Sequence, residues 1–186
     1  MLVEQKHENR YSGSPESLRH KWRNRMMNMI PVVDRVLDTF KPHSVCDIGC
    51  GSGNFSEEFA KRGLTVGGVD VNPKMIQSIQ KYVPDMDARI APAEKLPFDD
   101  NTFDLAFMSF VLHEVDDQMK TLLEARRVAR KGIAILDFPY DRVLLGPPRR
   151  VRIKPERLRA QCLHLGLALP EVVEYQKAVL FLIPTG

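Results

Sequence analysis

Three glycines at alternate positions, Gly49, Gly51 and Gly53, follow a short apolar run and precede a segment of helical character. Glycine keeps side chains away from the loop surface and permits the positive φ angles of a sharp strand-to-helix turn. Such a turn is suited to a nucleotide-like ligand. The dinucleotide fingerprint Gly-x-Gly-x-x-Gly would need a third glycine at Asn54 or Ser56. The Gly-x-Gly-x-Gly spacing therefore disfavours a nicotinamide dehydrogenase.

A carboxylate at the end of a second predicted strand completes this signal. Residues 64–70 form an apolar run that ends in Asp70, and its carboxylate can accept both hydroxyl groups of a ribose. Ligands bind at the carboxyl ends of the strands in doubly wound sheets, so we expect residues 47–53 and Asp70 to lie side by side. The two strand ends predict one ligand site.

An alternating order of strands and helices is predicted to position these residues. Ser14 and Asn72 are expected as helix caps, each followed by a proline in the first turn. The expected helices span 16–40, 54–62, 73–82, 116–130 and 155–165, and the expected strands after 64–70 span 88–91, 103–109, 132–138, 171–175 and 178–183. The last two strands are two residues apart, which indicates an antiparallel hairpin at the sheet edge.

The first of these helices is predicted from helical spacing of apolar residues, with a kink expected at Pro31. The residues expected on one face are Leu18, Trp22, Met26, Met29, Ile30, Val33 and Leu37.

Composition is that of one globular domain: the chain has 186 residues, of which 44% are hydrophobic. No long apolar run predicts a membrane span, and the polar N-terminus does not resemble a signal peptide, so we expect a cytoplasmic protein. The three cysteines are an odd number and do not indicate a disulfide framework. Cys46 and Cys50 lack the second ligand pair of a zinc site and are interpreted as packing residues, so no metal is expected.

Beyond the glycine loop, the sequence resembles the class I S-adenosylmethionine-dependent methyltransferases, in particular the small-molecule type related to the ubiquinone and menaquinone biosynthesis methyltransferases. Residues 69–75 resemble the family's second motif, 93–98 its third, and 101–105 with 109–114 its fourth. The motifs occur in the family's order between roughly residues 40 and 138. The resemblance implies a doubly wound, Rossmann-like α/β sheet of seven strands, mostly parallel with the antiparallel C-terminal edge hairpin, and S-adenosylmethionine as cofactor.

The resemblance also implies roles for individual residues. The glycine loop would surround the methionine part of the cofactor, Asp70 would accept from the ribose, and the following residues would pack on the adenine. The implied cofactor-binding residues are Asp47, Gly49, Cys50, Gly51, Gly53, Asp70, Val71, Met75, Ala93, Glu94 and Ser109. Family members usually carry aspartate where this chain has Pro92, so either Glu94 receives the adenine amino group or the affinity is lower.

Two further residues have competing interpretations. His113 follows the fourth predicted parallel strand, where the methyl group should point, and a neutral imidazole there can accept a proton from an acceptor hydroxyl or amine. Alternatively, His113 and Glu114 stabilise the local turn. Tyr11 is either part of a lid over the cofactor or a surface residue on a mobile tail.

Methyl transfer from a sulfonium is an in-line displacement, so the protein mainly has to align the acceptor and exclude water, and such alignment can be worth about 7–11 kcal/mol of barrier.

We expect a single domain over residues 1–186. Its parts are a helical lid segment (1–40), a cofactor-binding core (41–138) and a substrate-side loop, helix and hairpin (139–186).

The acceptor class is predicted from charge. The net charge is only +3, but basic residues cluster after the fifth parallel strand, over the expected substrate site: Arg142, Arg149, Arg150, Arg152, Lys154, Arg157 and Arg159. This favours a small anionic acceptor over nucleic acid. Residues 137–140 resemble a motif of amino-group methyltransferases but follow the wrong strand. The alternatives left open are an RNA methyltransferase and a non-catalytic S-adenosylmethionine-binding protein.

Overall fold

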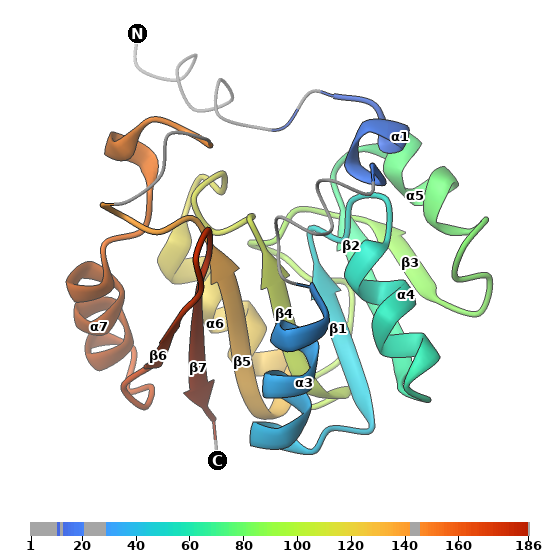
Figure 1. Cartoon of the computed structure of the whole chain (residues 1–186). Coiled ribbons are helices and arrows are strands. Elements are labelled where there is room, and N and C mark those ends of the chain that lie inside the picture. Colours follow the sequence, from blue (N-terminus) through green and yellow to red (C-terminus); the bar gives the residue numbers. More distant parts are fainter. Residues whose placement is uncertain (1–10, 12, 21–28, 142–145, 186) are drawn as a thin grey trace, which may run out of the picture.

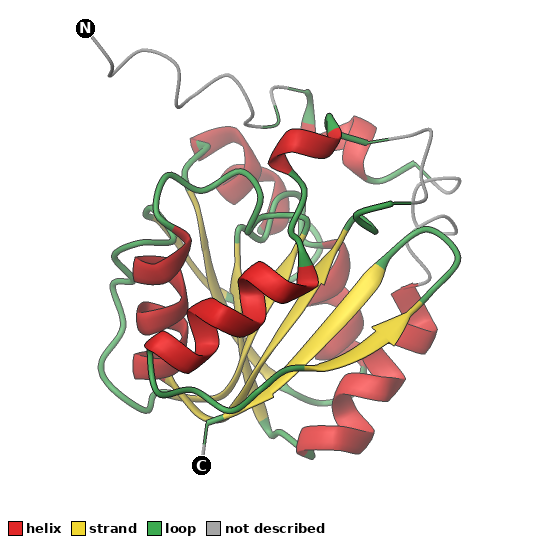
Figure 2. Cartoon of the chain, turned by 90° about the vertical axis from the view of Figure 1, so that its left-hand side faces the viewer, coloured by secondary structure: helices red, strands yellow, loops and turns green. Residues whose placement is uncertain are grey.

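The computed structural model of the chain describes residues 11, 13–20, 29–141 and 146–185, and it shows one seven-stranded sheet between two layers of helices (Figures 1 and 2). The strand order is β3-β2-β1-β4-β5-β7-β6. The strands are β1 (Ser44–Ile48), β2 (Thr65–Asp70), β3 (Asp87–Ile90), β4 (Phe103–Ser109), β5 (Ala129–Asp137), β6 (Glu171–Glu174) and β7 (Val179–Pro184). The first five are parallel, and β7 lies antiparallel between β5 and β6.

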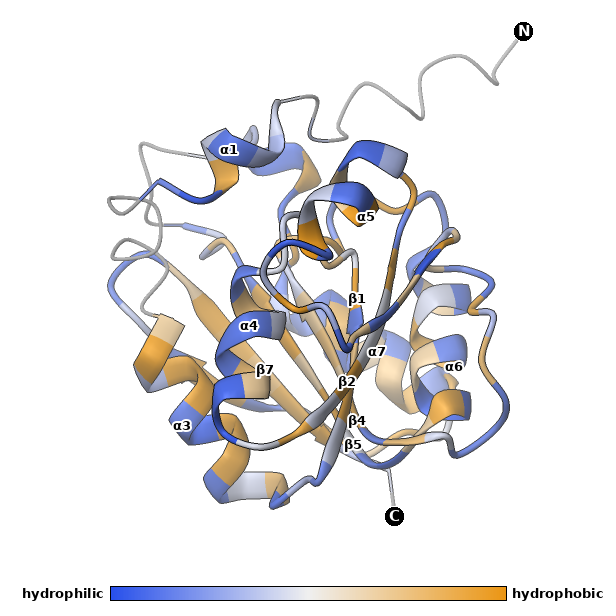
Figure 3. Ribbon diagram, turned by 90° about the vertical axis from the view of Figure 1, so that its right-hand side faces the viewer, coloured by the Kyte–Doolittle hydropathy of each residue, from blue (hydrophilic) through white to orange (hydrophobic). Residues whose placement is uncertain are grey.

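Helices cover both faces of this sheet. The helices are α1 (Pro15–Leu18), α3 (Met29–Phe40), α4 (Asn54–Lys61), α5 (Pro73–Ile79), α6 (Gln118–Val128) and α7 (Pro155–His164), with a 3₁₀ turn, η1, at Arg149–Val151. Buried side chains of α3, α4 and α5 pack in one apolar cluster, and those of α6 and α7 in another. Successive strand residues such as Val45 and Cys46 enter opposite clusters, as expected for a sheet buried on both faces. Figure 3 shows the resulting apolar strands beneath helices that also carry polar residues.

Local sequence accounts for several helix ends. The side chains of Ser14, Asn72 and Asp117 accept hydrogen bonds from backbone amides in the first turns of α1, α5 and α6. The glycines at 63 and 166 follow α4 and α7 with positive φ angles. The two predicted caps, Ser14 and Asn72, are thus confirmed, although α5 is three residues shorter than predicted.

Fold class and the C-terminal hairpin are confirmed, but the long first helix is wrong in part. α1 ends at Leu18 and is followed by Arg19 and His20 outside a helix, so residues 16–40 do not form one continuous helix. Apolar spacing records which face is buried, but it does not show whether the helix is continuous. Trp22 and Met26 lie outside the described residues. The predicted substrate-side loop after β5 contains the short turn η1.

No helix within the described ranges combines the length and the apolar character needed to cross a membrane.

Close approach of β1 and β2 depends on the absence of a side chain at Gly68. A Cβ atom there would overlap the backbone carbonyl oxygen of Asp47, its partner in β1. We expect Gly68→Ala to lower the free energy of unfolding by about 2–3 kcal/mol, because the two strands would have to separate. Urea denaturation of the ligand-free protein measures this change.

The control is Gly166→Ala, where φ is +64° and a Cβ atom would meet no atom within 4 Å. This variant should lower the free energy of unfolding by only about 1 kcal/mol, which is the cost of a left-handed backbone conformation for alanine. If both variants lost the same stability, the close approach of β1 and β2 would not be the constraint.

Candidate active site

A cavity lies at the carboxyl ends of the parallel strands, where the sequence predicted a ligand site. Its walls come from the glycine loop after β1, the end of β2, the segment after β3, and the ends of β4 and β5. Tyr11 and Leu18 complete the wall from the N-terminal segment. Residues far apart in the sequence are therefore gathered at one edge of the sheet.

The glycine loop is held against the end of β2 by three successive backbone amides. The amides of Gly49 and Cys50 both donate to the carbonyl oxygen of Val69, at 2.8 and 2.9 Å. The amide of Gly51 donates to Oδ2 of Asp70 at 2.9 Å. Gly49 and Gly51 have φ angles of +70° and +54°, which side-chain-bearing residues rarely adopt. The predicted proximity of the loop and Asp70 is confirmed.

Asp70 also orders the chain that follows it. Its Oδ1 accepts from the Asn72 amide at 2.8 Å, so each carboxylate oxygen already has one backbone donor. Burial raises the pKa of Asp70, and the backbone hydrogen bonds oppose that rise. A carboxylate oxygen can accept more than one hydrogen bond, so Asp70 retains the capacity to bind hydroxyl groups at the cavity wall.

Asp47 lies behind the glycine loop and does not line the cavity. Its Oδ2 accepts from the Ser56 hydroxyl at 2.5 Å, while its Oδ1 is buried without a hydrogen-bond partner among the described residues. Burial raises the pKa of Asp47 from its ordinary value of 3.8 to about 7. Gly53 also lies away from the cavity wall, because it precedes α4 and packs against Ile79.

The other predicted cofactor residues line the cavity: Cys50, Val71, Met75, Ala93, Glu94, Ser109 and Tyr11. Met75 is buried, while Val71 is 45% exposed beside it on the same segment. Oε1 of Glu94 accepts from the amides of Asp116 and Asp117, at 2.9 and 3.3 Å. Glu94 thus ties the segment after β3 to the start of α6, and its role toward adenine stays a prediction.

His113 lies in the wall of the same cavity and is paired with a residue that the sequence analysis did not select. Its Nδ1 is 2.8 Å from Oδ1 of Asp137, at the end of β5, and both side chains are buried. That same oxygen accepts from the Phe138 amide, so it acts as an acceptor and Nδ1 of His113 carries the proton. Nε2 is then the nitrogen available as a base, and it lies 3.7 Å from Oε1 of Glu114.

The carboxylates around His113 set its protonation. Burial lowers the pKa of the imidazole, but the charge and hydrogen bond of Asp137 outweigh burial, Glu114 adds to them, and the pKa is raised. The alternative in which His113 only stabilises its local turn does not describe this contact, because Asp137 comes from another strand. The sequence signal for Asp137 was its place at the end of a predicted strand, beside the end of β4.

Two aromatic residues lie on the His113 side of the cavity, with Phe138 next to the imidazole and Phe110 next to Phe138. The ring of Phe138 lies 5.6 Å from the imidazole and 4.6 Å from the ring of Phe110, between centroids. Phe110 has a φ angle of +58°, an uncommon conformation for a bulky residue, and strain of this kind is often found at functional sites. The apolar, planar rings of Phe110 and Phe138 therefore form this side of the cavity, beside the imidazole of His113.

Comparisons with known proteins agree with this geometry. A family model described as a methyltransferase domain matches residues 46–136. Over these residues, and in its fold, the chain resembles the class I S-adenosylmethionine-dependent methyltransferases.

Individual curated relatives match part of this chain. Demethylmenaquinone methyltransferase from Renibacterium salmoninarum is 35% identical over 107 residues, 58% of this chain and 45% of that protein. Ubiquinone/menaquinone biosynthesis C-methyltransferase UbiE from Geobacter sp. (strain M21) is 35% identical over 105 residues, 50% of this chain and 45% of that protein. The chain thus spans less than half the length of these curated relatives in the matched regions.

Among solved structures, a SAM dependent methyltransferase from Aquifex aeolicus shares the fold with a TM-score of 0.80. It is 22% identical in sequence, and the match covers 92% of this chain and 97% of that chain.

The donor set of this cavity fits S-adenosylmethionine. The Ser52 hydroxyl oxygen is buried at the cavity without a hydrogen-bond partner among the described residues, as is Oδ1 of Asp47 behind the loop. Asp70 presents a carboxylate suited to ribose hydroxyls, and Met75 with Ala93 presents apolar surface suited to adenine. Polar and apolar groups are therefore arranged as a sulfonium nucleoside requires.

The basic segment after β5 does not reach this cavity in the part of the chain that the structure describes. Arg149 and Lys154 lie over the ring of Tyr140, and Arg152 donates to the carbonyl oxygens of Pro139 and Pro147. None of these basic side chains lines the cavity, and Arg142 lies outside the described residues. An anionic acceptor therefore stays a prediction.

The raised pKa of Asp47 predicts how stability depends on pH. Between about pH 4 and pH 7 the folded protein holds a proton that the unfolded chain releases, so the free energy of unfolding falls as pH rises through this window. Asp47→Asn removes this proton while it can still accept from Ser56. We expect the melting temperature of the variant, relative to the natural protein, to rise from pH 4 to pH 7 and then level off.

Differential scanning calorimetry of both ligand-free proteins across this range makes the measurement. Asp70 is present in both proteins, and its charge is one cause of the raised pKa of Asp47, so the difference reports the titration of Asp47 together with this coupling. A difference in melting temperature that stayed constant with pH would show that Asp47 is ionised throughout.

Proposed function

We propose that this methyltransferase transfers a methyl group from S-adenosylmethionine to a small planar acceptor whose hydroxyl group is deprotonated by His113. The observation that carries the proposal is that one cavity joins the glycine loop and Asp70 to the His113–Asp137 pair. The glycine loop and Asp70 suit the cofactor. The His113–Asp137 pair is chemically useful only if a proton has to leave the acceptor.

S-adenosylmethionine supplies an electrophilic methyl group on a sulfonium centre. The chain's own contribution begins with orientation: the loop backbone and Asp70 hold the two ends of the cofactor, while Phe110 and Phe138 align a flat acceptor at van der Waals contact. Such alignment places the acceptor in line with the S–CH3 bond that breaks, with the thioether as leaving group, and cofactor and acceptor together displace water from the cavity.

His113 then takes up the acceptor's proton at Nε2 as the acceptor's electron pair forms the new bond to the methyl group. Asp137 holds the ring in the tautomer that leaves Nε2 unprotonated, and it stabilises the imidazolium that forms. The same proton transfer serves transfer to carbon, because an ionised ring hydroxyl raises the electron density of the neighbouring ring carbon.

The acceptor class rests on the relatives as well as on the cavity. Demethylmenaquinone methyltransferase and the C-methyltransferase UbiE are named for quinones, which are flat ring compounds. The aromatic wall beside His113 suits such a ring, and the hydroxyl proton that His113 would remove exists only in the reduced, hydroquinone form. We therefore propose a hydroquinone-type acceptor for this chain.

Binding of S-adenosylhomocysteine tests the cofactor half of the site. We expect calorimetric titration to show binding by the natural protein and none of NAD at the same concentration. In Asp70→Ala the affinity should fall at least about tenfold, because hydrogen bonds from the ribose hydroxyls to a charged group are lost.

Asp70 also holds the glycine loop, so circular dichroism must show that the variant is folded at the temperature of the titration. Preference for NAD, or undiminished binding of S-adenosylhomocysteine by folded Asp70→Ala, would contradict the assignment.

Removal of the Asp137 charge tests the catalytic half. In Asp137→Asn the burial that lowers the pKa of His113 remains while the carboxylate that raises it is gone, so this pKa should fall. Because a base works only when unprotonated, the acidic limb of the pH–rate profile should move to lower pH. Histidine NMR titration measures the pKa, and methyl transfer to a short-chain hydroquinone measures the profile.

His113→Ala identifies the NMR signal of His113 and serves as the catalytic control. It should bind S-adenosylhomocysteine like the natural protein but transfer the methyl group at least about 100-fold more slowly. If Asp137→Asn left both the imidazole pKa and the pH profile unchanged, the pair would be structural.

A further inference from the structure

The N-terminal strap, defined as residues 11 and 13–20, lies across the mouth of the cofactor half of the cavity. Figure 1 shows α1, within this strap, beyond the carboxyl ends of the sheet and next to α5. Tyr11 and Leu18 form part of the cavity wall. A Cβ atom on Gly51 would lie 3.1 Å from Cδ1 of Leu18, so the strap rests directly on the glycine loop.

Polar contacts hold the strap, because α1 contributes no buried residue to the core. The Tyr11 amide donates to Oε2 of Glu114 at 3.1 Å, beside His113. At the other end, Nδ2 of Asn54 donates to the Leu18 carbonyl oxygen at 2.7 Å. A segment fixed by few buried apolar contacts opens at lower free-energy cost than the core does.

Arg19 makes the densest set of these contacts. Its Nη1 donates to the carbonyl oxygen of Ser52, in the glycine loop, at 2.8 Å. Its Nη2 pairs with Glu57 of α4, and its guanidinium lies 3.4 Å from the ring centroid of Tyr82. The Arg19 side chain is only 18% exposed. One side chain thus connects the strap to the loop, to α4 and to the segment after α5.

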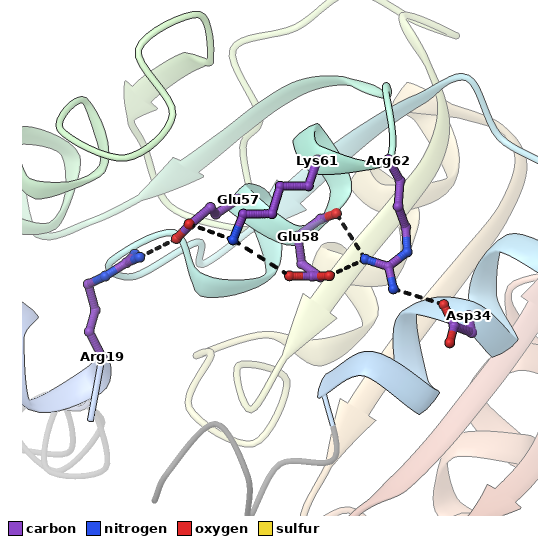
Figure 4. Close-up of polar contacts among 6 residues, drawn as sticks. All are labelled: Arg19, Asp34, Glu57, Glu58, Lys61 and Arg62. Atoms are coloured by element: carbon purple, nitrogen blue, oxygen red, sulfur yellow. Dashed lines mark hydrogen bonds and ion pairs between the residues drawn. The ribbon is translucent and has the colours of Figure 1, made fainter. Parts of the chain in front are cut away.

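Glu57 and Glu58 are adjacent on α4 and both contact Lys61, but only Glu57 contacts Arg19 and only Glu58 contacts Arg62, as Figure 4 shows. Glu57 pairs with Arg19 of the strap and, at 2.7 Å, with Lys61. Glu58 pairs with Arg62, which reaches Asp34 of α3 at 2.9 Å. The side chains are 25% and 15% exposed, respectively, so both pairs are partly shielded from water. Of these two glutamates, only Glu57 forms an ion pair with the described residues of the strap.

We propose that the Arg19–Glu57 pair is a latch that holds the N-terminal strap closed over the bound cofactor and so sets how long the cofactor stays bound. Both are positioning residues, since Arg19 acts through the Ser52 carbonyl and the strap. The inference rests on the proposed cofactor site.

The physical basis is linkage between strap closure and binding. The cofactor can enter or leave only when the strap is displaced from the loop, whereas Tyr11 and Leu18 can contact it only when the strap is closed. For a ligand that binds only the closed form, the apparent dissociation constant equals the intrinsic dissociation constant divided by the fraction of protein in the closed form. Loss of the latch lowers that fraction, which weakens binding mainly through faster dissociation.

The matched test is Glu57→Gln against Glu58→Gln in the full chain. Glu57→Gln should raise the dissociation constant and the dissociation rate of S-adenosylhomocysteine about fivefold, whereas Glu58→Gln should change both less than about twofold. In the ligand-free protein, trypsin should cut after Arg19 faster in Glu57→Gln than in Glu58→Gln, with mass spectrometry locating the cut. S-adenosylhomocysteine should slow this cleavage.

A double-mutant cycle identifies the partner of Glu57. Arg19→Ala and Glu57→Gln should weaken binding by less together than the product of their separate effects, because each removes the same pair. Independent effects, or equal behaviour of Glu57→Gln and Glu58→Gln in a natural protein that binds S-adenosylhomocysteine, would overturn the latch alone. A natural protein that binds no S-adenosylhomocysteine would overturn the proposed function and the latch together.

Discussion

The bonds between the glycine loop and the end of β2 are the constraint on which the rest of the site depends. Three successive amides, of Gly49, Cys50 and Gly51, are drawn toward Val69 and Asp70, and this is possible only because the loop adopts positive φ angles. With the loop turned in this way, α4 starts at Asn54 and runs back along the sheet. The loop surface that remains exposed is backbone, onto which a ligand or the strap can settle closely.

This arrangement carries a cost in the ligand-free protein. Asp47 and Asp70 are both buried near the loop, and burial raises the pKa of each carboxyl group. Charged groups held in such surroundings destabilise the fold unless they gain partners. Asp70 lines the cavity, so the hydroxyl groups of a ligand can supply partners to it, whereas Asp47 lies behind the loop. Asp70 can therefore weaken the empty protein and strengthen binding, a trade that is common at functional sites.

How far the sequence predicts this molecule depends on whether the relevant interaction is local. Helix caps at Ser14 and Asn72 and the C-terminal hairpin depend on neighbouring residues, and they were predicted. Asp137 was missed as the partner of His113 because the two residues are 24 positions apart in the sequence and come together only through the pairing of β4 with β5. Gly53 resembles the other loop glycines in sequence, but it packs on Ile79 away from the cavity wall. The end of α1 could not be predicted from the spacing of apolar residues, because this spacing shows which face of a helix is buried and not where the helix stops.

The strap joins the two halves of the cavity through its two ends. Arg19 binds the glycine loop on the cofactor side, while the Tyr11 amide binds Glu114, whose other oxygen lies 3.7 Å from Nε2 of His113. Closure of the strap on the cofactor thus also fixes a carboxylate next to the base. Because Glu114 contributes to the raised pKa of His113, a strap that moves would change the field around the imidazole as well as the cover of the cavity. The strap therefore completes the surroundings of the base as well as the cover over the cofactor half of the cavity.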